Sequence, residues 1–208
     1  MTHETLYPGL YAAAPGVEEV LAEVAGSTAE KAREIVALRE ETGRLHADRL
    51  AGCAAALARA FAAGGRLFAF GNGGSGTDGH ALAELFANPG PGRRPLPALA
   101  LTSDVAVITA LGNDIGFEVV FARRLAALGR AGDIAVGLST SGDSANVIRA
   151  LGEAGRMGMI TVGFAGYDGG RMRDRVDHLF VVPSSSVHRI QEAQTTLYHV
   201  LWEAVQAA

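Results

Sequence analysis

The chain has 208 residues, 49% of them hydrophobic, and a formal net charge of -4. This length and composition predict one domain of ordinary size with a substantial core. The weakly acidic balance, without a run of Lys or Arg, argues against a nucleic-acid partner. No apolar run reaches the ~18 residues of a membrane-spanning helix. The start of the chain carries no secretory signal, so we expect a cytoplasmic protein with no membrane partner.

The N-terminal part predicts one long helix. Residues 1–26 show little periodicity, and Ser27-Thr28-Ala29-Glu30 reads as a capping box that opens a helix. Apolar residues then recur at roughly helical spacing until Gly64-Gly65 ends the pattern. They are Ile35, Leu38, Leu45, Leu50, Leu57 and Phe61. A helix of this length needs a partner, which we expect another subunit to supply. The single cysteine, Cys53, excludes an internal disulfide and is expected in the core.

Five short apolar runs follow, and helical patterns separate them. These runs are residues 67–70, 99–101, 134–138, 160–164 and 179–182. Strands without polar alternation that alternate with helices predict a parallel sheet covered on both faces. We therefore expect a three-layer α/β/α sandwich, flavodoxin-like, with about five parallel strands. In such folds, ligands bind at the carboxyl ends of the strands.

The first strand leads into a glycine-rich turn, Gly71-Asn72-Gly73-Gly74-Ser75, before a helix. Glycines let the backbone approach a ligand closely, and the start of a helix attracts anions. Ser75 adds a hydroxyl group. The spacing differs from Gly-x-Gly-x-x-Gly, and no Lys follows as it would in a Walker loop. A turn with no further role is the alternative interpretation.

The third strand leads into a hydroxyl-rich loop, Ser139-Thr140-Ser141-Gly142-Asp143-Ser144, again before a helix. One hydroxyl is enough to cap a helix start. Four hydroxyls are better explained by a ligand with many oxygens, such as phosphate. Two anion-binding turns at the same edge of the sheet therefore predict a phosphate-bearing substrate.

In these two turns the chain resembles the sugar isomerase (SIS) domain family, and more closely its phosphoheptose isomerases. Further matches are Gly112-Asn113-Asp114, Ser144-Ala145-Asn146-Val147, Asp168-Gly169-Gly170-Arg171-Met172 and Arg189-Ile190-Gln191-Glu192. The resemblance runs from about residue 49 to the C-terminus. It implies a SIS phosphosugar isomerase domain at 49–208, an oligomerisation segment at 1–48, and a homotetramer. It also implies conversion of sedoheptulose 7-phosphate to D-glycero-D-manno-heptose 7-phosphate.

Four side chains have the spacing that this chemistry needs. An aldose-ketose shift requires a base beside the carbonyl and an acid or metal at the enediol oxygen. His80 and Glu84 lie one turn apart on the helix after the glycine-rich turn, and Gln191 and His199 share roughly one face of the last helix. Two imidazoles, a carboxylate and an amide oxygen can form a tetrahedral zinc site.

The resemblance implies roles for these residues. Glu84 would be the base and His199 the acid, and zinc would be bound by His80, Glu84, Gln191 and His199. Contacts with the sugar phosphate would come from Asn72, Gly73, Gly74, Ser75, Asn113, Asp114, Ser139, Thr140, Ser141, Ser144 and Gln191.

The chain departs from the family pattern at one point. It has one residue fewer between Ser75 and His80 than the family does. An alignment without a gap would put Ala81 and Leu85 at the positions of the catalytic histidine and glutamate. A gap in the turn restores His80 and Glu84 to these positions, and we favour that alignment.

Two other functions stay open. Replication-initiation regulators related to this family bind the initiator DnaA and lack the catalytic glutamate and final histidine. This chain has Glu84 and His199, which favours an enzyme. A phosphosugar sensor would use the same turns but often carries a DNA-binding domain, for which this chain shows no segment.

Overall fold

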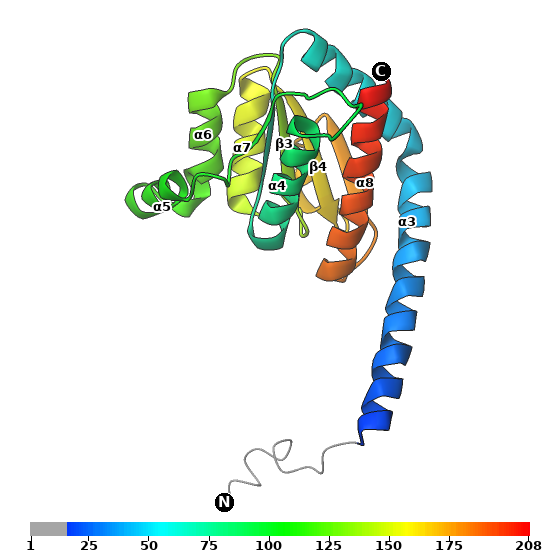
Figure 1. Cartoon of the computed structure of the whole chain (residues 1–208). Coiled ribbons are helices and arrows are strands. Elements are labelled where there is room, and N and C mark those ends of the chain that lie inside the picture. Colours follow the sequence, from blue (N-terminus) through cyan, green and yellow to red (C-terminus); the bar gives the residue numbers. More distant parts are fainter. Residues whose placement is uncertain (1–15) are drawn as a thin grey trace, which may run out of the picture. The chain divides into compact units, whose positions relative to one another are not determined.

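The computed structural model describes residues 16–208, which divide after Ala37 into two units. The first unit holds the beginning of helix α3 and the second holds an α/β domain (Figure 1). The α-helices are α3 (Val17–Ala62), α4 (Gly73–Ala87), α5 (Val105–Asp114), α6 (Val120–Leu128), α7 (Ala145–Arg156) and α8 (Val187–Ala207). Two short 3-10 helices are η1 (Phe117–Val119) and η2 (Gly170–Met172). None of the helices described is long and apolar enough to cross a membrane.

The start predicted for the long helix is wrong. Helix α3 begins at Val17, where Glu18 and Glu19 in its first turn favour the positive end of the helix dipole. Ser27, the predicted cap, lies inside the helix, and its hydroxyl accepts a hydrogen bond from the Lys31 ammonium. The helix ends just before the predicted glycine pair.

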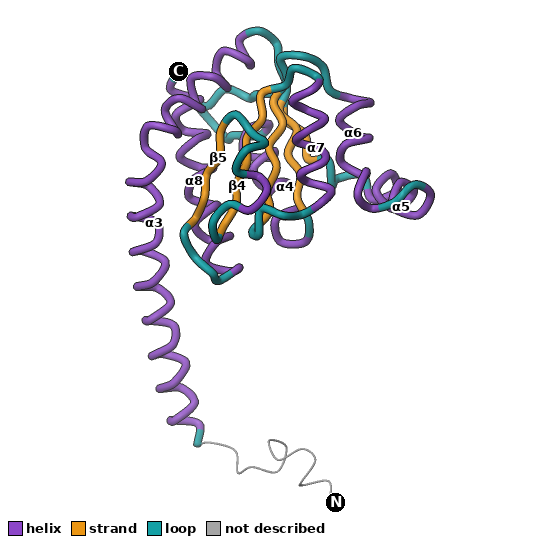
Figure 2. The backbone as a smooth tube through the Cα atoms, turned by 180° about the vertical axis from the view of Figure 1, so that it is seen from behind, coloured by secondary structure: helices purple, strands orange, loops and turns teal. Residues whose placement is uncertain are grey.

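The strands form one parallel sheet of five, in the order β2-β1-β3-β4-β5 (Figure 2). They are β1 (Leu67–Gly71), β2 (Ala98–Ala100), β3 (Ile134–Ser139), β4 (Ile160–Gly166) and β5 (His178–Val182). This is the predicted flavodoxin-like order. Every residue of β1 and β3 is buried, which explains their continuous apolar runs.

Helices cover both faces of the sheet. Helices α6 and α7 pack over one face, and α4 and α8 pack over the other (Figures 1 and 2). The first face is centred on Phe70 and Phe121, whose rings lie 5.4 Å apart. On the second face, Phe61 of α3 stacks on Phe86 of α4. The predicted three-layer sandwich is confirmed.

The last half of α3 protects the edge strand β5. His46 Nε2 lies 2.8 Å from the Val181 carbonyl oxygen, and Arg49 donates to the Leu179 carbonyl at 2.5 Å. These bonds occupy polar groups that an exposed strand edge would offer to another chain. Cys53, one turn further on, is fully buried as predicted, and burial raises the pKa of its thiol to about 12.

Candidate active site at the carboxyl ends of the strands

The glycine turn (residues 71–75) lies between β1 and α4, and its last three residues form the first turn of that helix. Gly73 has φ +53, a backbone conformation that favours glycine. Asn72 occupies the N-cap position, but its side chain makes no capping hydrogen bond. The backbone N–H groups of this first turn therefore lack a side-chain cap, as an anion site requires.

The hydroxyl loop (residues 139–144) follows β3 and is organised by bonds between its own hydroxyls. Ser139 Oγ lies 3.0 Å from Ser144 Oγ and 3.4 Å from Ser141 Oγ. Ser141 Oγ also accepts a hydrogen bond from the Asp143 N–H at 3.1 Å. Ser144 is the N-cap residue of α7, yet its side chain does not cap that helix. Helix capping therefore does not explain these hydroxyls.

The turn at residues 168–172 braces the hydroxyl loop. Gly142 has φ +70, and a Cβ built on it would lie 2.1 Å from the Gly169 carbonyl oxygen. The Arg171 N–H donates to the Asp143 carboxylate at 2.9 Å, and the Arg171 guanidinium pairs with the same carboxylate. The N–H bond and the guanidinium lower the pKa of Asp143. Both turns carry motifs noted in the sequence, and their close packing explains the glycine at 142.

A pair of amides joins the glycine turn to the first turn of α7, which directly follows the hydroxyl loop. Asn72 Nδ2 donates to Asn146 Oδ1 at 2.8 Å, and Asn146 Nδ2 donates to Asn72 Oδ1 at 2.9 Å. Asn146 is buried in the first turn of α7. The fold therefore brings the two predicted phosphate turns together.

A cavity of about 390 Å³ opens beside the glycine turn. It is lined by Gly71, Gly73, Gly76, Thr77, His80, Thr102 and Ser103. His80 thus faces the site, and its Nδ1 lies 3.4 Å from Ser103 Oγ. Sequence reasoning missed the three hydroxyl residues. Thr102 and Ser103 follow β2 at the same edge, which is the signal that could have found them.

Two predicted site residues, Gln191 and His199, lie on α8 in different surroundings. A Cβ at Gly74 would lie 2.5 Å from Gln191 Nε2, so the Gln191 amide packs directly on the glycine turn. His199 is exposed, and its Nδ1 lies 2.8 Å from the Thr195 carbonyl oxygen. Because a carbonyl only accepts, Nδ1 carries the proton and Nε2 is left as a lone-pair donor for a metal or an acid-base partner.

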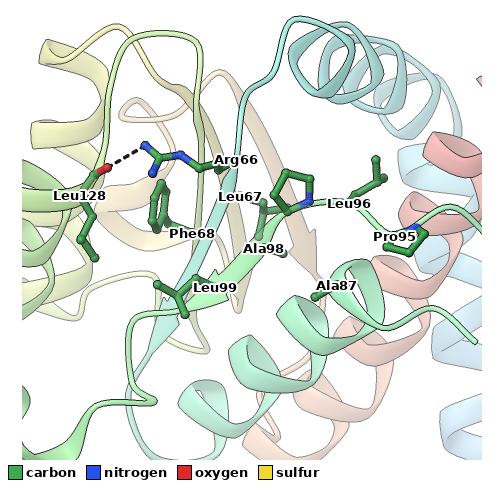
Figure 3. A pocket seen from close by; sticks show the side chains of 10 residues that line it. Arg66, Leu67, Phe68, Ala87, Pro95, Leu96, Ala98, Leu99 and Leu128 are labelled. Atoms are coloured by element: carbon green, nitrogen blue, oxygen red, sulfur yellow. Dashed lines mark hydrogen bonds between the residues drawn. The ribbon is translucent and has the colours of Figure 1, made fainter.

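A second cavity, of about 350 Å³, lies at the opposite end of the sheet (Figure 3). Its lining is mainly apolar, with Pro95, Leu96 and Leu99 beside β2. Its one charged side chain, Arg66, donates to the Leu128 carbonyl at 2.7 Å and lies over the Phe68 ring (Figure 3). This cavity offers no free acid, base or hydroxyl for catalysis.

Comparison with known proteins agrees with the geometry. The SIS domain family model matches residues 32–166. The chain belongs to the SIS-domain phosphoheptose isomerase family. A phosphoheptose isomerase of Aquifex aeolicus (strain VF5) is 46% identical over 163 residues, which cover 78% of this chain and 85% of that protein. One from Paramagnetospirillum magneticum is 48% identical over 147 residues, 70% of this chain and 77% of that protein.

Solved phosphoheptose isomerases have the same fold over most of this chain. The structure from Neisseria gonorrhoeae aligns with a TM-score of 0.83 at 34% identity and covers 89% of this chain and 100% of its own. The structure from Francisella tularensis aligns with a TM-score of 0.84 at 32% identity and covers 89% of this chain and 99% of its own. The Vibrio vulnificus NanR protein, in complex with ManNAc-6P, aligns at 0.64 with 16% identity, over 90% of this chain and 65% of that one, and shares the fold alone.

The remaining residues implied by the family resemblance lie apart from the cavity lining. Glu84 is exposed, and its Oε2 accepts a hydrogen bond from Asn88 Nδ2 at 2.7 Å. Asn113 and Asp114, at the end of α5, are exposed and hydrogen-bonded to each other at 2.7 Å. Across residues 16–208, no three His, Cys, Asp or Glu side chains gather as a metal site. The metal and catalytic roles therefore stay predictions.

Asp78 is a further acidic group that sequence reasoning did not single out. It lies on α4 between the glycine turn and His80, and its Oδ2 is buried with no hydrogen-bond partner among the described residues. Burial raises the pKa of this carboxyl. Burial also raises the pKa of the Tyr198 hydroxyl on α8, and the charge of Asp78 adds to that shift. Helices α4 and α8 pack against each other, and Asp78 and Tyr198 lie close enough to interact electrostatically.

Proposed function

We propose that the protein is an aldose-ketose isomerase that interconverts sedoheptulose 7-phosphate and D-glycero-D-manno-heptose 7-phosphate. The observation that carries this proposal is the pair of joined turns at one edge of the sheet. Both turns begin helices whose N-cap side chains do not cap, and the hydroxyl loop presents Ser139, Ser141 and Ser144 together. Such a site suits a phosphate group. The family relatives named above support the heptose substrate.

The proposed reaction moves one proton from carbon to carbon. The hydroxyl loop binds the phosphate, and the sugar extends along the glycine turn towards α4. Glu84 removes a proton from C1 of the ketose, and the electrons of that bond form the enediol. Return of a proton to C2 gives the aldose. His199 donates and accepts the proton at the carbonyl oxygens, through the Nε2 that its bond to Thr195 leaves open.

We further propose that His80, Glu84, Gln191 and His199 hold one zinc ion. The donor types fit zinc, and the Thr195 carbonyl beside His199 Nδ1 leaves Nε2 of that ring for a metal, while His80 has Nδ1 beside the Ser103 hydroxyl. Because Nε2 of His199 cannot bind a metal and transfer a proton at the same time, bound zinc would polarise the substrate carbonyl in place of His199. The Gln191 amide already packs against the glycine turn, and Glu84 follows His80 by one helical turn.

The proposed assembly is a homotetramer that acts in the cytoplasm. In the first unit, Val17, Leu21 and Val24 are more than half exposed along one helix. In the second unit, the last half of α3 and α8 border an apolar groove that includes Leu50 and Leu197. Apolar surfaces of this kind favour association with further copies. Light scattering on the purified chain would measure the mass, and a monomer would contradict the proposal.

Replacement of the proposed base tests the activity. Wild type should convert sedoheptulose 7-phosphate to the aldose, as followed by chromatography of the two sugar phosphates. Glu84→Gln keeps the shape of the side chain but cannot accept the proton, so the rate should fall by about 100-fold or more.

Three results would contradict the proposal in different ways. Equal rates for wild type and Glu84→Gln would remove Glu84 from the mechanism. A wild-type protein that binds the sugar phosphate without converting it would be a sensor. A wild-type protein that neither binds nor converts it, but binds DnaA, would be a replication regulator.

A further inference from the structure

We infer that Asn146 is a positioning residue, which acts with Asn72 to set the distance between the bound phosphate and the base on α4. The inference rests on the proposed isomerase function and assigns a role to the amide pair (Asn72 and Asn146). It also changes the role expected for Asn72, which the family resemblance places in contact with the sugar.

The amide pair continues the link between two strands beyond the end of the sheet. Strands β1 and β3 are paired in register as far as Gly71 and Leu138. Past that point the chain enters the glycine turn on one side and the hydroxyl loop on the other. The two hydrogen bonds of the pair, at 2.8 and 2.9 Å, join these turns where the backbone ladder has stopped. Each amide both donates and accepts, which sets the relative position of the turns.

Each turn has its own support, so the pair is not needed to form either one. The hydroxyl loop is held by its own hydroxyl bonds and by Gly169 and Arg171. The glycine turn is held by β1 and by the Gln191 amide. Loss of the pair should therefore leave both turns formed, but the glycine turn should open more often and shift relative to the hydroxyl loop.

The distance between the two turns matters for the reaction. In the proposed reaction the hydroxyl loop binds the phosphate at one end of the substrate, and α4 carries His80, which lines the cavity, and the proposed base Glu84 one turn further on. A misplacement of about 1 Å can cost on the order of 100-fold in rate. The Asn72 side chain is directed to Asn146, and Asn72 is not among the residues that line the cavity. The Asn72 side chain therefore holds Asn146, while its backbone lies between the cavity-lining residues Gly71 and Gly73.

The test is a double-mutant cycle with Asn72→Ala, Asn146→Ala and the double variant on the full chain. Each single variant should lower kcat by about tenfold or more and change KM by less than about threefold, because binding groups stay in place. The double variant should be no slower than Asn146→Ala by more than about twofold, because the two amides act as one unit.

Thr161→Val is the matched control for lost stability. Thr161 is buried at the start of β4, far from the site, and its hydroxyl bonds to Asp177. This variant should lose stability with little change in kcat. A purely structural role for Asn146 would be indicated if kcat fell equally in Thr161→Val at the same loss of Tm. An unchanged kcat in Asn146→Ala, or a double variant slower by the product of the single effects, would overturn the inference.

Amide hydrogen exchange tests the role of the amide pair without relying on the proposed activity. If wild type shows no turnover, the isomerase proposal fails, and exchange then decides the role of the pair. Asn146→Ala should speed exchange in a peptide that covers residues 71–79 and leave residues 134–144 within about threefold of wild type. Unchanged exchange at 71–79 would overturn the positioning role whatever the activity.

Discussion

The two ends of the parallel sheet differ in how far their polar groups are hydrogen-bonded to one another. At the amino end, the buried Asp133 carboxylate accepts hydrogen bonds from the Arg66 and Arg130 N–H groups and pairs with the Arg66 guanidinium at 2.7 Å. Thr161 and Asp177 bond each other in both directions. These groups satisfy one another, so they stabilise the fold and are not available to a ligand.

At the carboxyl end, some polar groups satisfy one another, as Asn72 and Asn146 do, but others keep hydrogen-bonding capacity for a ligand. The helices α4 and α7 begin without side-chain caps, Ser139 and Ser144 bond each other, and His80 and His199 each keep one ring nitrogen open. The two cavities follow the same division, since the one at the amino end is apolar and the one at the carboxyl end is bordered by His80. Polar groups that the fold gathers but does not satisfy mark the functional end.

The strongest test of this contrast is Gly142→Ala in the hydroxyl loop. Alanine is strained at φ +70, and its Cβ would meet the Gly169 carbonyl oxygen at 2.1 Å, so the loop must move. The strain alone costs ~1–3 kcal/mol. We expect kcat/KM to fall by about 100-fold or more in steady-state assays. Gly152→Ala in α7 is the control, because nothing lies within 4 Å of its added Cβ. Equal activity of the two variants would show that the loop shape is not needed.

Asp133→Asn should lower the stability of the fold, because it changes the amino end of the sheet, and should leave kcat unchanged. Burial opposes ionisation of Asp133, but hydrogen bonds from Arg66 and Arg130 outweigh it and lower its pKa. Because the pKa of Asp133 is lower in the folded protein, its ionisation stabilises the fold at pH values above 3.8, the pKa in the unfolded chain. This stability is lost as the pH falls through the folded pKa. We expect the variant to be less stable by about 2 kcal/mol at neutral pH. Urea unfolding should show this difference shrinking below about pH 4, with kcat unchanged.

Ser103→Ala should have a smaller effect, confined to the carboxyl end. Ser103 Oγ lies 3.4 Å from His80 Nδ1 and favours the ring orientation that leaves Nε2 open. Loss of such a partner weakens metal affinity by about tenfold. Competition with a zinc chelator would measure the affinity of the metal-free protein, and Ser103→Thr should restore it. Equal zinc affinity in wild type and Ser103→Ala would show that Ser103 does not support zinc binding.

The sheet was predictable because buried parallel strands are continuous apolar runs between turn residues. The beginning of α3 was not, because Ser27-Thr28-Ala29-Glu30 matches a capping box, whereas the Glu, Leu and Ala residues before it are good helix formers and, with the acidic first turn, extend the helix back to Val17. Leu45 fits the helical pattern but is exposed, whereas Thr42 and His46 are buried. His46 is buried because it bonds the edge of β5, a contact that no local pattern reveals.

The site was predictable in part for a related reason. The glycine turn and the hydroxyl loop are each a continuous stretch of sequence, so each can be recognised as a motif. The cavity residues Thr102 and Ser103 follow β2 but form no motif of their own, and the role of Asn146 depends on its partner Asn72 in the glycine turn. Contacts between elements cannot be derived from spacing within one element.

Proton NMR in D₂O shows whether the carboxyl end of the sheet isomerises a phosphosugar. Wild-type protein is incubated with sedoheptulose 7-phosphate, and the anomeric region is followed. We expect new aldose signals with deuterium at C2, because Glu84 is exposed and the proton that it removes exchanges with solvent. An unchanged ketose spectrum with folded protein would contradict the proposed isomerisation.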